Sequence, residues 1–390
     1  MQINCDVLVV GGGVAGVPAA VAASRSGAST VLVERESFLG GTGVTALHRY
    51  VCGLYLNGSG APKETLNPGL TREIVASLRQ LAPSSHPLQM GRVWGLPFQP
   101  AHLRSVFTKL ATEEKNLTLL ASSTLKAVEC EGGRIVSVTV QTPENEVIIL
   151  PRTVIDATGS GALIRLSGAP FVHSPEPERQ PGGCTLHLEG VDGDPEFLPL
   201  KIASQLGRLP ASKASCLLPF AGFAAGSEPR EGFCKFSLPP EIAGIDEAVL
   251  EQRMIQIHAL LAELLPVELG RSRIVGRSRL MEREGIRLAG EWELDEASIL
   301  NARKFANGVA RNAWPIESWE PGSSGPVYSY PPDGDYYEIP RRCLRSRTVT
   351  NLFATGRCIS ASSKALASTR TMGTCFALGE AAGKLAAIYR

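Results

Sequence analysis

The stretch CDVLVVGGGVAG at residues 5–16 decides the fold class of this chain. Its apolar half has the length of a buried strand, and glycines follow in the G-x-G-x-x-G pattern. In such a turn the first glycine permits a tight bend, the second lets a phosphate approach the backbone, and the third lets a helix pack on the strand. Unpaired amides at the helix start then face the anion. The predicted pyrophosphate cradle consists of Gly11, Gly13, Val14, Ala15 and Gly16.

The residues after this turn complete a strand-helix-strand unit. We expect a helix over Val17 to Ser26, a left-handed cap at Gly27 and a second strand over Ser29 to Val33. Glu34 then stands about 20 positions after the glycines, where an acidic residue binds a ribose hydroxyl. A carboxylate at this position argues against a ribose 2′-phosphate. The alternative, an unrelated glycine-rich turn, is disfavoured because all four features are in register.

Composition places the chain among globular proteins. It has 390 residues, of which 44% are hydrophobic and 20% charged, enough for two cores. The sequence shows neither a long apolar span nor a signal peptide, so we expect a cytoplasmic protein without a membrane span. Lysine and arginine total 39 against 38 acidic residues, without a long basic run, which argues against a nucleic-acid partner.

The cysteines and the common catalytic motifs narrow the chemistry further. Nine cysteines are dispersed without a C-x-x-C pair, which favours reduced thiols over disulfides or a zinc site. We therefore predict no metal site. The sequence also lacks an H-E-x-x-H zinc motif, a Walker A lysine turn and a G-x-S-x-G nucleophile elbow.

Further elements follow along the chain. A second glycine-rich loop, Arg35 to Gly43, would be superfluous in a nicotinamide-binding unit and indicates a longer cofactor. Its candidate contacts are Arg35, Gly40, Gly41 and Thr42. We expect a helix over His102 to Lys115 and then strands over Leu117 to Ala121, Leu125 to Cys130, Ile135 to Gln141, Glu146 to Leu150 and Thr153 to Asp156. The last strand ends in the small-residue turn Ala157, Thr158 and Gly159.

The C-terminal segment repeats the arrangement of a strand and a glycine turn. Asn351 to Thr355 is a predicted strand that leads into Gly356 and Arg357. A helix over Met372 to Ile388, rich in alanine and glycine, is expected to pack closely on its neighbours. Its first turn, Thr371, Met372, Gly373 and Thr374, would offer free amides and a partial positive charge.

Taken together and in order, these segments resemble the FAD-dependent oxidoreductases of the glutathione-reductase-type fold, related to the fumarate reductase flavoprotein group. The resemblance implies an α/β fold: a Rossmann-like FAD-binding domain with a parallel sheet and a three-stranded β-meander, plus an inserted α+β substrate domain. The implied FAD-binding domain covers 1–170, with a substrate-side excursion at 57–97, and 339–390, and the inserted domain covers 171–338. FAD would lie extended, with its ribose on Glu34, its adenine at the main chain near Leu125 and its flavin ring at the last helix.

The inserted region resembles the family only loosely, and we expect it to supply the substrate wall. Cys184 to Glu189 and Phe233 to Leu238 alternate like strands. Asp246 to Leu265 is a predicted helix. Its expected inward residues are Val249, Met254, Ile257, Leu260 and Leu261. The proline-rich segments Ser174 to Pro177 and Pro321 to Asp335 are expected to be loops, and the second carries Tyr328 and Tyr330.

A flavin accepts a hydride at N5, so the protein has to orient the substrate and handle a proton. In proteins of this type the segment that carries His48, Arg49 and Cys52 passes close to the flavin ring. His48 is either a general base with a pKa of roughly 6.5 or a histidine that packs. Arg49 is either a clamp for a substrate carboxylate or a surface arginine. Cys52 is either a redox thiol or a small buried residue.

Arg370 and Glu317 complete the catalytic candidates. Arg370 precedes the turn expected at the flavin, where it would bind an acidic substrate or the flavin O2, or pair with a scaffold carboxylate. Many similar proteins carry a Pro-Ile-Asp-x-His segment where this chain has Glu317 for the acid and Trp319 for the histidine. Gly161 stands where relatives often have an acidic residue. Further pocket candidates are Arg283, Tyr336 and Tyr337.

These features predict an FAD-dependent oxidoreductase that transfers a hydride between a small organic substrate and flavin N5. The sequence lacks a second G-x-G-x-x-G turn for a nicotinamide cofactor, so electrons would pass through the substrate, oxygen or a protein partner. A flavin-dependent monooxygenase and a non-catalytic flavin-binding protein are the alternatives. A tRNA-modifying flavoprotein is disfavoured by the balanced charge. The oligomeric state is left open.

Overall fold

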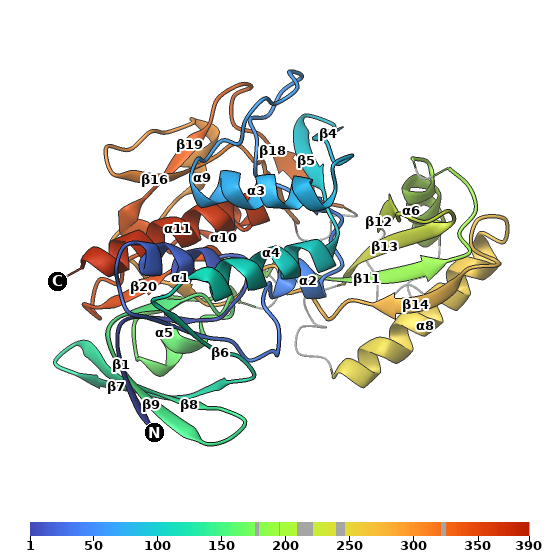
Figure 1. The fold of residues 1–390 in the computed structure, drawn as a ribbon. Helices are drawn as coiled ribbons and strands as arrows, with labels where there is room; N and C mark the ends of the chain where they lie inside the picture. Colours follow the sequence, from blue (N-terminus) through green and yellow to red (C-terminus); the bar gives the residue numbers. More distant parts are fainter. Residues whose placement is uncertain (176–178, 195, 209–220, 239–245, 321–324, 390) are drawn as a thin grey trace.

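A computed structural model covers the chain, and the structure describes all residues except 176–178, 195, 209–220, 239–245, 321–324 and 390. Figure 1 shows a large body, in which helices cover a central sheet, and a smaller part in which helices lie beside a second sheet. Both termini lie in the large body. The middle of the chain therefore leaves this body to form the smaller part and then returns.

The central sheet has seven strands in the order β6-β2-β1-β9-β8-β7, with β20 also paired to β9. Their bounds are β1 (Gln2–Val10), β2 (Thr30–Val33), β6 (Leu117–Leu120), β7 (Thr124–Glu131), β8 (Arg134–Gln141), β9 (Glu146–Asp156) and β20 (Leu352–Ala354). All neighbours pair in parallel except β7 with β8 and β8 with β9. Val7, Leu8 and Val9 are fully buried, as in a parallel strand covered on both faces. The predicted α/β class, parallel sheet and meander are confirmed.

Strand β9 corrects one expectation about the central sheet. The segments predicted as two strands, Glu146 to Leu150 and Thr153 to Asp156, form a single strand. The reason is its pairing with β1, which keeps one register from Gln2 opposite Ile148 to Val10 opposite Asp156. On its other edge β9 pairs first with β8 and then with β20. One strand thus joins the meander to the parallel sheet.

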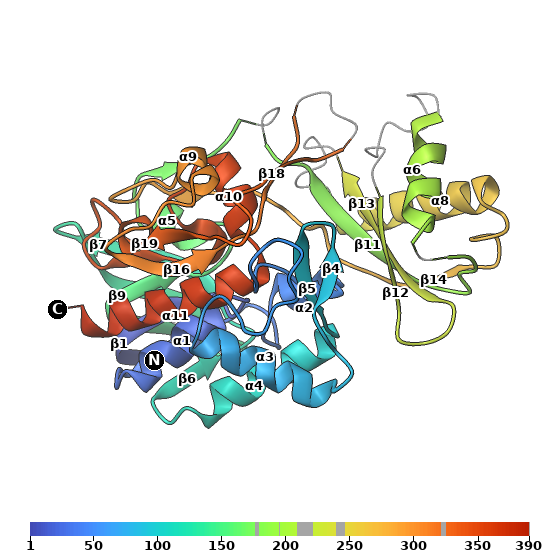
Figure 2. The same cartoon turned by 90° about the horizontal axis from the view of Figure 1, so that it is seen from above.

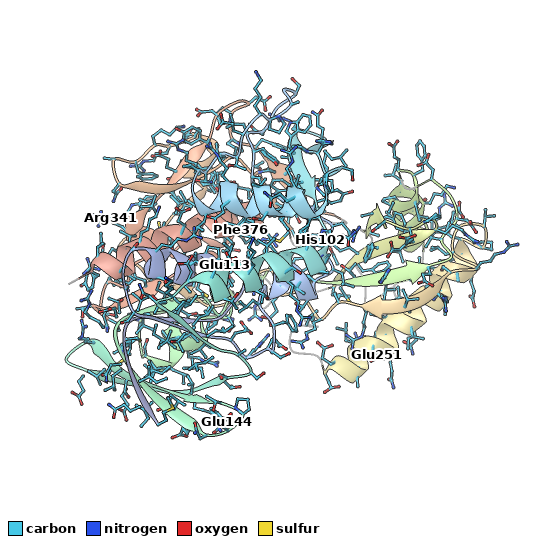
Figure 3. The ribbon with its side chains drawn as sticks, viewed as in Figure 1. His102, Glu113, Glu144, Glu251, Arg341 and Phe376 are labelled. Carbon is cyan, nitrogen blue, oxygen red and sulfur yellow. The ribbon has the colours of Figure 1, made fainter. Side chains whose placement is uncertain are left out.

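The four longest helices among the described residues of the large body share a hydrophobic core with one face of this sheet. They are α1 (Gly16–Arg25), α3 (Leu70–Leu81), α4 (Pro100–Glu113) and α11 (Met372–Ile388). Phe376 of α11, labelled in Figure 3, is fully buried and meets Phe107 of α4 edge-on, with ring centroids 5.9 Å apart. The predicted α1, α4 and α11 are confirmed within two residues at each end. The sequence analysis missed α3, which lies in the expected excursion at 57–97.

The smaller part is a four-stranded antiparallel sheet in the order β12-β13-β11-β14. Its strands are β11 (Gly182–Glu189), β12 (Ala221–Ala225), β13 (Glu231–Leu238) and β14 (Arg273–Arg277), and its helices are α6 (Leu198–Arg208) and α8 (Glu247–Leu264). Figure 2 shows both helices against the sheet, and they share a separate core with it. The predicted inward face of α8 is wrong at Val249, which is 41% exposed, because Leu250 in the next position faces the core instead.

The remainder of the region 171–338 packs on the large body. Strands β16 (Gly308–Asn312) and β19 (Tyr337–Pro340) pair with each other and contribute Ala310 and Ile339 to the core around α11. Strands β17 (Ile316–Ser318) and β18 (Val327–Ser329) form a second pair. The predicted loop over Pro321 to Asp335 therefore contains a strand, β18. Residues 321–324 of this loop lie outside the described residues, and so do residues 176–178 of the predicted loop Ser174 to Pro177. We propose that the inserted domain is narrower than 171–338 and centres on β11 to β14.

Short elements connect these parts. They are α2 (Thr42–Thr45), β3 (Tyr50–Val51), β4 (Leu88–Met90), β5 (Val93–Pro97), α5 (Ala162–Leu166), β10 (Phe171–Val172), β15 (Arg287–Leu288), α9 (Glu296–Leu300), η3 (Arg341–Cys343), η4 (Gly356–Cys358) and α10 (Ser363–Thr369). The smaller part meets the large body beside α2 and β5 (Figures 1 and 2). None of the helices in the described ranges has the length and apolar character needed to cross a membrane.

Candidate functional site

The glycine turn after β1 has the close packing that its sequence predicts. Gly11 has a φ of +104°, and a Cβ there would lie 2.5 Å from the carbonyl oxygen of Ala157. A Cβ on Gly16 would lie 1.7 Å from the carbonyl oxygen of Gly11. Gly13 differs, because the nearest atom to its Cβ position is Gly41 Cα at 4.0 Å. The turn is therefore packed behind Gly11 and Gly16 and open at Gly13, which fits the approach of a phosphate group.

Glu34 at the end of β2 is buried and holds the neighbouring backbone. Its Oε2 accepts a hydrogen bond from the Gly12 amide at 2.5 Å, and its Oε1 accepts one from the Glu36 amide at 2.9 Å. Each carboxylate oxygen keeps a lone pair that suits a ribose hydroxyl. The neighbouring Arg35 side chain is 76% exposed and pairs with Glu36 at 3.5 Å. Of these two predicted contacts, Glu34 alone lies against the glycine turn through its side chain.

The second glycine-rich loop lies directly against the first. The Gly40 amide donates to the Gly12 carbonyl at 2.8 Å. A Cβ on Gly41, whose φ is +48°, would come within 3.0 Å of Gly13 Cα. Thr42 then begins α2. Two loops that are separate in the sequence thus form one glycine-lined surface, as an extended dinucleotide would require.

The turn after β9 joins the same edge of the sheet. Asp156 is fully buried and accepts hydrogen bonds from the amides of Thr158 and Ile164 at 2.9 Å each and from the Thr158 hydroxyl at 2.7 Å. Burial raises the pKa of Asp156, and these hydrogen bonds oppose that rise. The Ala157 amide donates to the Val10 carbonyl at 2.9 Å. Asp156 therefore fixes the predicted Ala157 to Gly159 turn beside the glycine turn of β1.

Arg357 ties the C-terminal strand to this turn. Its Nε donates to the Gly159 carbonyl at 3.3 Å, and its Nη1 lies 3.4 Å from the Thr42 hydroxyl oxygen. Gly356 has a φ of +62°, and a Cβ there would meet the Cβ of Ala15 at 3.0 Å. Leu125 lies apart, in β7, where the pairing with β8 is irregular between Leu125 and Ala127. Its predicted contact with adenine stays a prediction.

The start of α11 is partly occupied by the protein's own backbone. The Gly373 amide donates to the Cys52 carbonyl at 2.8 Å, which corrects the expectation that the first amides of this helix are all free. A Cβ on Gly53 would lie 2.1 Å from the Thr371 hydroxyl oxygen, so the backbone next to Cys52 packs closely against the start of α11. The hydroxyl oxygens of Thr371 and Thr374 lie 3.0 Å apart. The structure thus brings the segment of His48 and Cys52 to the helix that was predicted to meet the flavin.

These residues fit FAD by their geometry and donor set. The carboxyl ends of β1, β2, β9 and β20 converge, and in sheets of this kind ligands bind at that edge. The edge carries an open glycine surface at Gly13, a carboxylate for ribose at Glu34 and, some distance along the chain, a helix start at Met372. The predicted cofactor segments other than β7 therefore meet in one region.

A group of ionisable side chains lies next to the start of α11. We call it the polar cluster, and its members are His48, Cys52, Lys235, Arg283, Glu317, Tyr328 and Arg370. The charges of Lys235, Arg283 and Arg370 all act on His48, and Cys52 and Glu317 act on Lys235. Arg370 directly precedes Thr371, which places the cluster at the helix start. Residues from both parts of the molecule thus share one electrostatic environment.

His48 does not have the ordinary pKa that a general base would need. Burial, and then the positive charges of Lys235, Arg283 and Arg370, lower its pKa to about 3. The imidazole is therefore neutral at neutral pH. The expectation of a base that titrates near pH 7 is wrong, because the sequence does not show that the charges of three cations act on this histidine. His48 remains able to donate or accept a hydrogen bond.

Arg370 and Glu317, far apart in sequence, are brought together. Arg370 Nη2 lies 3.8 Å from Glu317 Oε1, and both side chains are largely buried. Nε of Arg370 has no hydrogen-bond partner among the described residues. Arg49 lies outside the cluster, with its guanidinium carbon 4.6 Å from the centre of the Phe233 ring. Its predicted role as a carboxylate clamp is therefore the least supported of the four catalytic candidates.

The aromatic candidates divide between core and cluster. Tyr337 is fully buried, and its hydroxyl bonds Asn312 Nδ2 at 2.7 Å and the Ser368 hydroxyl at 2.6 Å, so it belongs to the core. Tyr336 lies between the side chains of Lys304 and Arg311. Neither supports the predicted pocket role. Tyr328 instead joins the cluster through the charges of Glu317, Arg283 and Arg370.

The structure explains one departure from the family pattern. Gly161 has a φ of +71°, and a Cβ there would lie 2.6 Å from Ile286. An acidic side chain would require both a strained backbone and displacement of Ile286. Trp319, at the position of the family histidine, is buried, and its ring centre lies 5.8 Å from the Arg283 guanidinium carbon. This tryptophan therefore packs beside the cluster.

Sequence reasoning missed Lys235 and underrated Arg283. In β13, Cys234, Phe236 and Leu238 belong to the core of the smaller part, so Lys235 faces away from it. A lysine within the alternating strand FCKFSL was a signal that could have been used. No local pattern could show that the charge of Lys235 acts on His48 and that the charge of Arg370 acts on Lys235. Within the described residues no group of three or more histidine, cysteine or acidic side chains could hold a metal ion.

Comparisons with known proteins identify the family of this chain and solved structures with a similar fold. No curated protein sequence matches the chain significantly. Among solved structures, it is similar to a flavoprotein/dehydrogenase from Cytophaga hutchinsonii, at 13% identity with a TM-score of 0.50, over 98% of this chain and 78% of that one. A triple mutant of the flavin-dependent brominase Bmp2 matches at 12% identity with a TM-score of 0.50, over 98% of this chain and 80% of that one.

The OxyS anhydrotetracycline hydroxylase from Streptomyces rimosus matches at 15% identity with a TM-score of 0.49, over 75% of this chain. This chain spans 55% of the length of that hydroxylase. At these identities the likeness extends to the fold alone. The sequence itself matches the family described as FAD dependent oxidoreductase over residues 6–390. The chain therefore belongs to the FAD-dependent oxidoreductase family, and FAD is its cofactor.

Proposed function

We propose that this chain transfers a hydride between a small organic substrate and N5 of its bound FAD. When bound, FAD supplies a two-electron acceptor or donor. The observation that carries the proposal is the polar cluster at the start of α11, where Arg370, next to the N-cap residue Thr371, lies 3.8 Å from Glu317. Ionisable groups gathered in a low-dielectric site are typical of a place where protons and charge are handled.

The residues of the cluster suggest distinct roles in oxidation of such a substrate. As the substrate loses a hydride to the flavin, it also has to lose a proton from its hydroxyl or amino group. Glu317 is the carboxylate of the cluster, and we propose it as the proton acceptor. Arg370, at 3.8 Å from Glu317, would orient the substrate beside that carboxylate. The two electrons would then pass to a second substrate, oxygen or a protein partner.

Anaerobic reduction of the bound flavin tests this function. We expect the flavin of the wild-type protein to bleach with at least one member of a panel of amino acids, hydroxy acids, amines and unsaturated acids, the last tested against pre-reduced flavin. Glu317→Gln should slow this reaction about 10²- to 10⁴-fold at unchanged FAD content, because the base is lost. Glu320→Gln is the matched control, since Glu320 is half-exposed and lies 4.0 Å from Lys364. Rapid bleaching by NADPH alone would contradict the proposal.

The same experiment separates the alternative functions. Several similar structures are those of flavin-dependent hydroxylases and a brominase, although the likeness is one of fold. Oxygen consumption coupled to a hydroxylated product would favour a monooxygenase. Protein that binds FAD but whose flavin is reduced by no compound of the panel would favour a non-catalytic flavin-binding protein.

A further inference from the structure

Lys235 is placed to bind a ligand. Its side chain leaves the face of β13 opposite the hydrophobic core, and no hydrogen bond or ion pair joins its ammonium group to a residue that the structure describes. Burial and the charges of Arg283 and Arg370 lower the pKa of Lys235 to about 8 despite the opposing charge of Glu317. A partly buried ammonium group without a partner is unfavourable unless an anion compensates its charge.

Arg283 supplies a second cation in a fixed position. Its Nη1 donates to the carbonyl oxygens of Pro181 at 2.5 Å and Gly182 at 2.6 Å, and its Nη2 donates to the Ser237 hydroxyl at 3.1 Å. These neutral acceptors hold the guanidinium without neutralising it. The described residues offer Arg283 no carboxylate within ion-pair distance, although the charge of Glu317 acts on it from further away. Ser237 lies two positions after Lys235 on β13 and therefore on the same face of the strand, so Arg283 and Lys235 are neighbours.

Arg370 is the third cation, and it is only weakly paired. Its contact with Glu317 is long at 3.8 Å, and its buried Nε has no hydrogen-bond partner among the described residues. The more distant charges of Arg357 and Glu284 also act on the pKa of Arg370, and they are opposite in sign. Among the described residues, three cations therefore face one carboxylate, that of Glu317, which leaves the polar cluster with an excess of two positive charges.

From this excess we infer that the site takes a small organic acid, with a carboxylate of the substrate bound between Lys235 and Arg370 and with Arg283 behind them. The inference rests on the proposed function, since it assigns a substrate class to the same site. Arginine can donate two parallel hydrogen bonds to one carboxylate, whereas lysine acts as a point charge. An acid with one or two carboxylates would offset the excess and use the free Nε of Arg370.

Binding of such an acid should depend on pH through Lys235. The titratable and charged groups that act on the Lys235 ammonium group are Cys52, Arg283, Glu317 and Arg370. The charge of Lys235 in turn lowers the pKa of His48. The ammonium is charged below its pKa of about 8, so affinity should be highest there and fall as the pH rises through this value. In Lys235→Arg the charge persists to higher pH, and the affinity should persist with it.

The experiment uses the FAD-loaded protein and matched probes: acetate with acetamide, succinate with succinamide, and benzoate with benzamide. Dissociation constants come from the change in the visible spectrum of the flavin and from the rise in thermal stability. We expect at least one acid to bind tenfold or more tightly than its amide. Lys235→Met should weaken that binding tenfold or more, and Lys235→Arg should retain it. Lys201→Met is the control. Lys201 lies on α6, on the opposite side of the sheet from Lys235, and pairs with Glu268.

Equal binding of acids and amides, binding of no acid, or unchanged acid binding in Lys235→Met at equal FAD content would each overturn the inference. A variant that shifts the midpoint potential of the flavin but binds acids normally would also overturn it, because the cations would then serve the reduced flavin. A neutral compound that bleaches the flavin when no acid binds would leave the proposed function standing. Acid binding as expected, without reduction by any compound, would instead overturn the proposed function alone.

Discussion

We propose that Glu34 serves both the fold and the cofactor. Its two carboxylate oxygens accept hydrogen bonds from Gly12 and Glu36, so the side chain holds the glycine turn and the following loop before any ribose is bound. An amide has one acceptor oxygen where a carboxylate has two. Either the Gly12 or the Glu36 amide would lose its acceptor in a glutamine variant.

We expect Glu34→Gln to weaken FAD binding about ten- to a hundredfold, because hydrogen bonds to a charged group contribute about 1.5 to 3 kcal/mol. The measurement is the ratio of flavin to protein after gel filtration, followed by titration of the apoprotein with FAD. Glu113→Gln, on the exposed face of α4 (Figure 3), is the matched control. Full FAD content with unchanged affinity in the Glu34 variant would contradict the assignment.

The neutral state of His48 leads to a second prediction at this scale. Because its pKa is about 3, His48 carries no charge between about pH 5 and pH 8 and should not appear in a pH profile over that range. His48→Gln should therefore change kcat/KM by a constant factor without changing the shape of the profile. Loss of an inflection near pH 6.5 in this variant would show that the histidine titrates after all.

At the scale of elements, the contact between α1 and α11 depends on two glycines. A Cβ on Gly379 would lie 2.1 Å from the carbonyl oxygen of Ala15, and one on Gly383 would lie 2.1 Å from that of Ala19. The helices therefore approach backbone to backbone. This contact matters for the site, because α1 begins at the glycine turn and α11 begins at the polar cluster.

We expect Gly383→Ala to destabilise the protein by about 1 to 3 kcal/mol, because the added methyl group forces the helices apart. Gly207→Ala in α6 is the matched control: nothing lies within 4 Å of its Cβ position, so alanine should be neutral or stabilising by up to about 1 kcal/mol. Urea unfolding of both variants provides the comparison. Equal stability of the two would show that α1 and α11 have room for a methyl group.

For the whole molecule, a buried ion pair joins distant segments. Glu284 and Arg287 are 4% and 2% exposed and pair with each other. Glu284 also accepts hydrogen bonds from the hydroxyls of Ser174 and Ser363, the latter at 2.9 Å. Burial alone would raise the pKa of Glu284, but these hydrogen bonds and the charge of Arg287 outweigh it and lower that pKa. The pair therefore links the base of the inserted domain to α10.

Arg287→Met should cost about 3 to 5 kcal/mol at pH 7, because it leaves a buried carboxylate unpaired. A lowered pKa means that the contribution of Glu284 is present above its unfolded pKa, about 4.3, and is lost as the pH falls through its folded pKa. The difference between wild type and variant should thus shrink toward acid pH in urea unfolding. Arg273→Met, in an exposed pair with Glu189, should cost about 1 kcal/mol or less.

Local patterns were sufficient for several of the main elements, including the glycine turn at which the cofactor is expected. The G-x-G-x-x-G turn, Glu34 and the long helices follow from spacing and periodicity, and the structure places them as expected. The same reasoning was wrong for His48, missed α3 and gave no role to Lys235. Each failure concerns a residue or segment whose neighbours are distant in the sequence. Three cations from other segments act on His48, and Lys235 lies in the second sheet.

The class of this protein follows from its sequence alone, because strand and helix periodicity and the glycine requirements of a phosphate turn are local properties of the backbone. The sequence thereby indicated the dinucleotide, and the family match establishes FAD. Which ionisable groups act on one another depends on the packed fold, since Lys235, Arg283, Glu317 and Arg370 come from four separate segments. Their pKa values and their excess of positive charge depend on burial and mutual distance. Those quantities do not exist until the two parts of the molecule pack together.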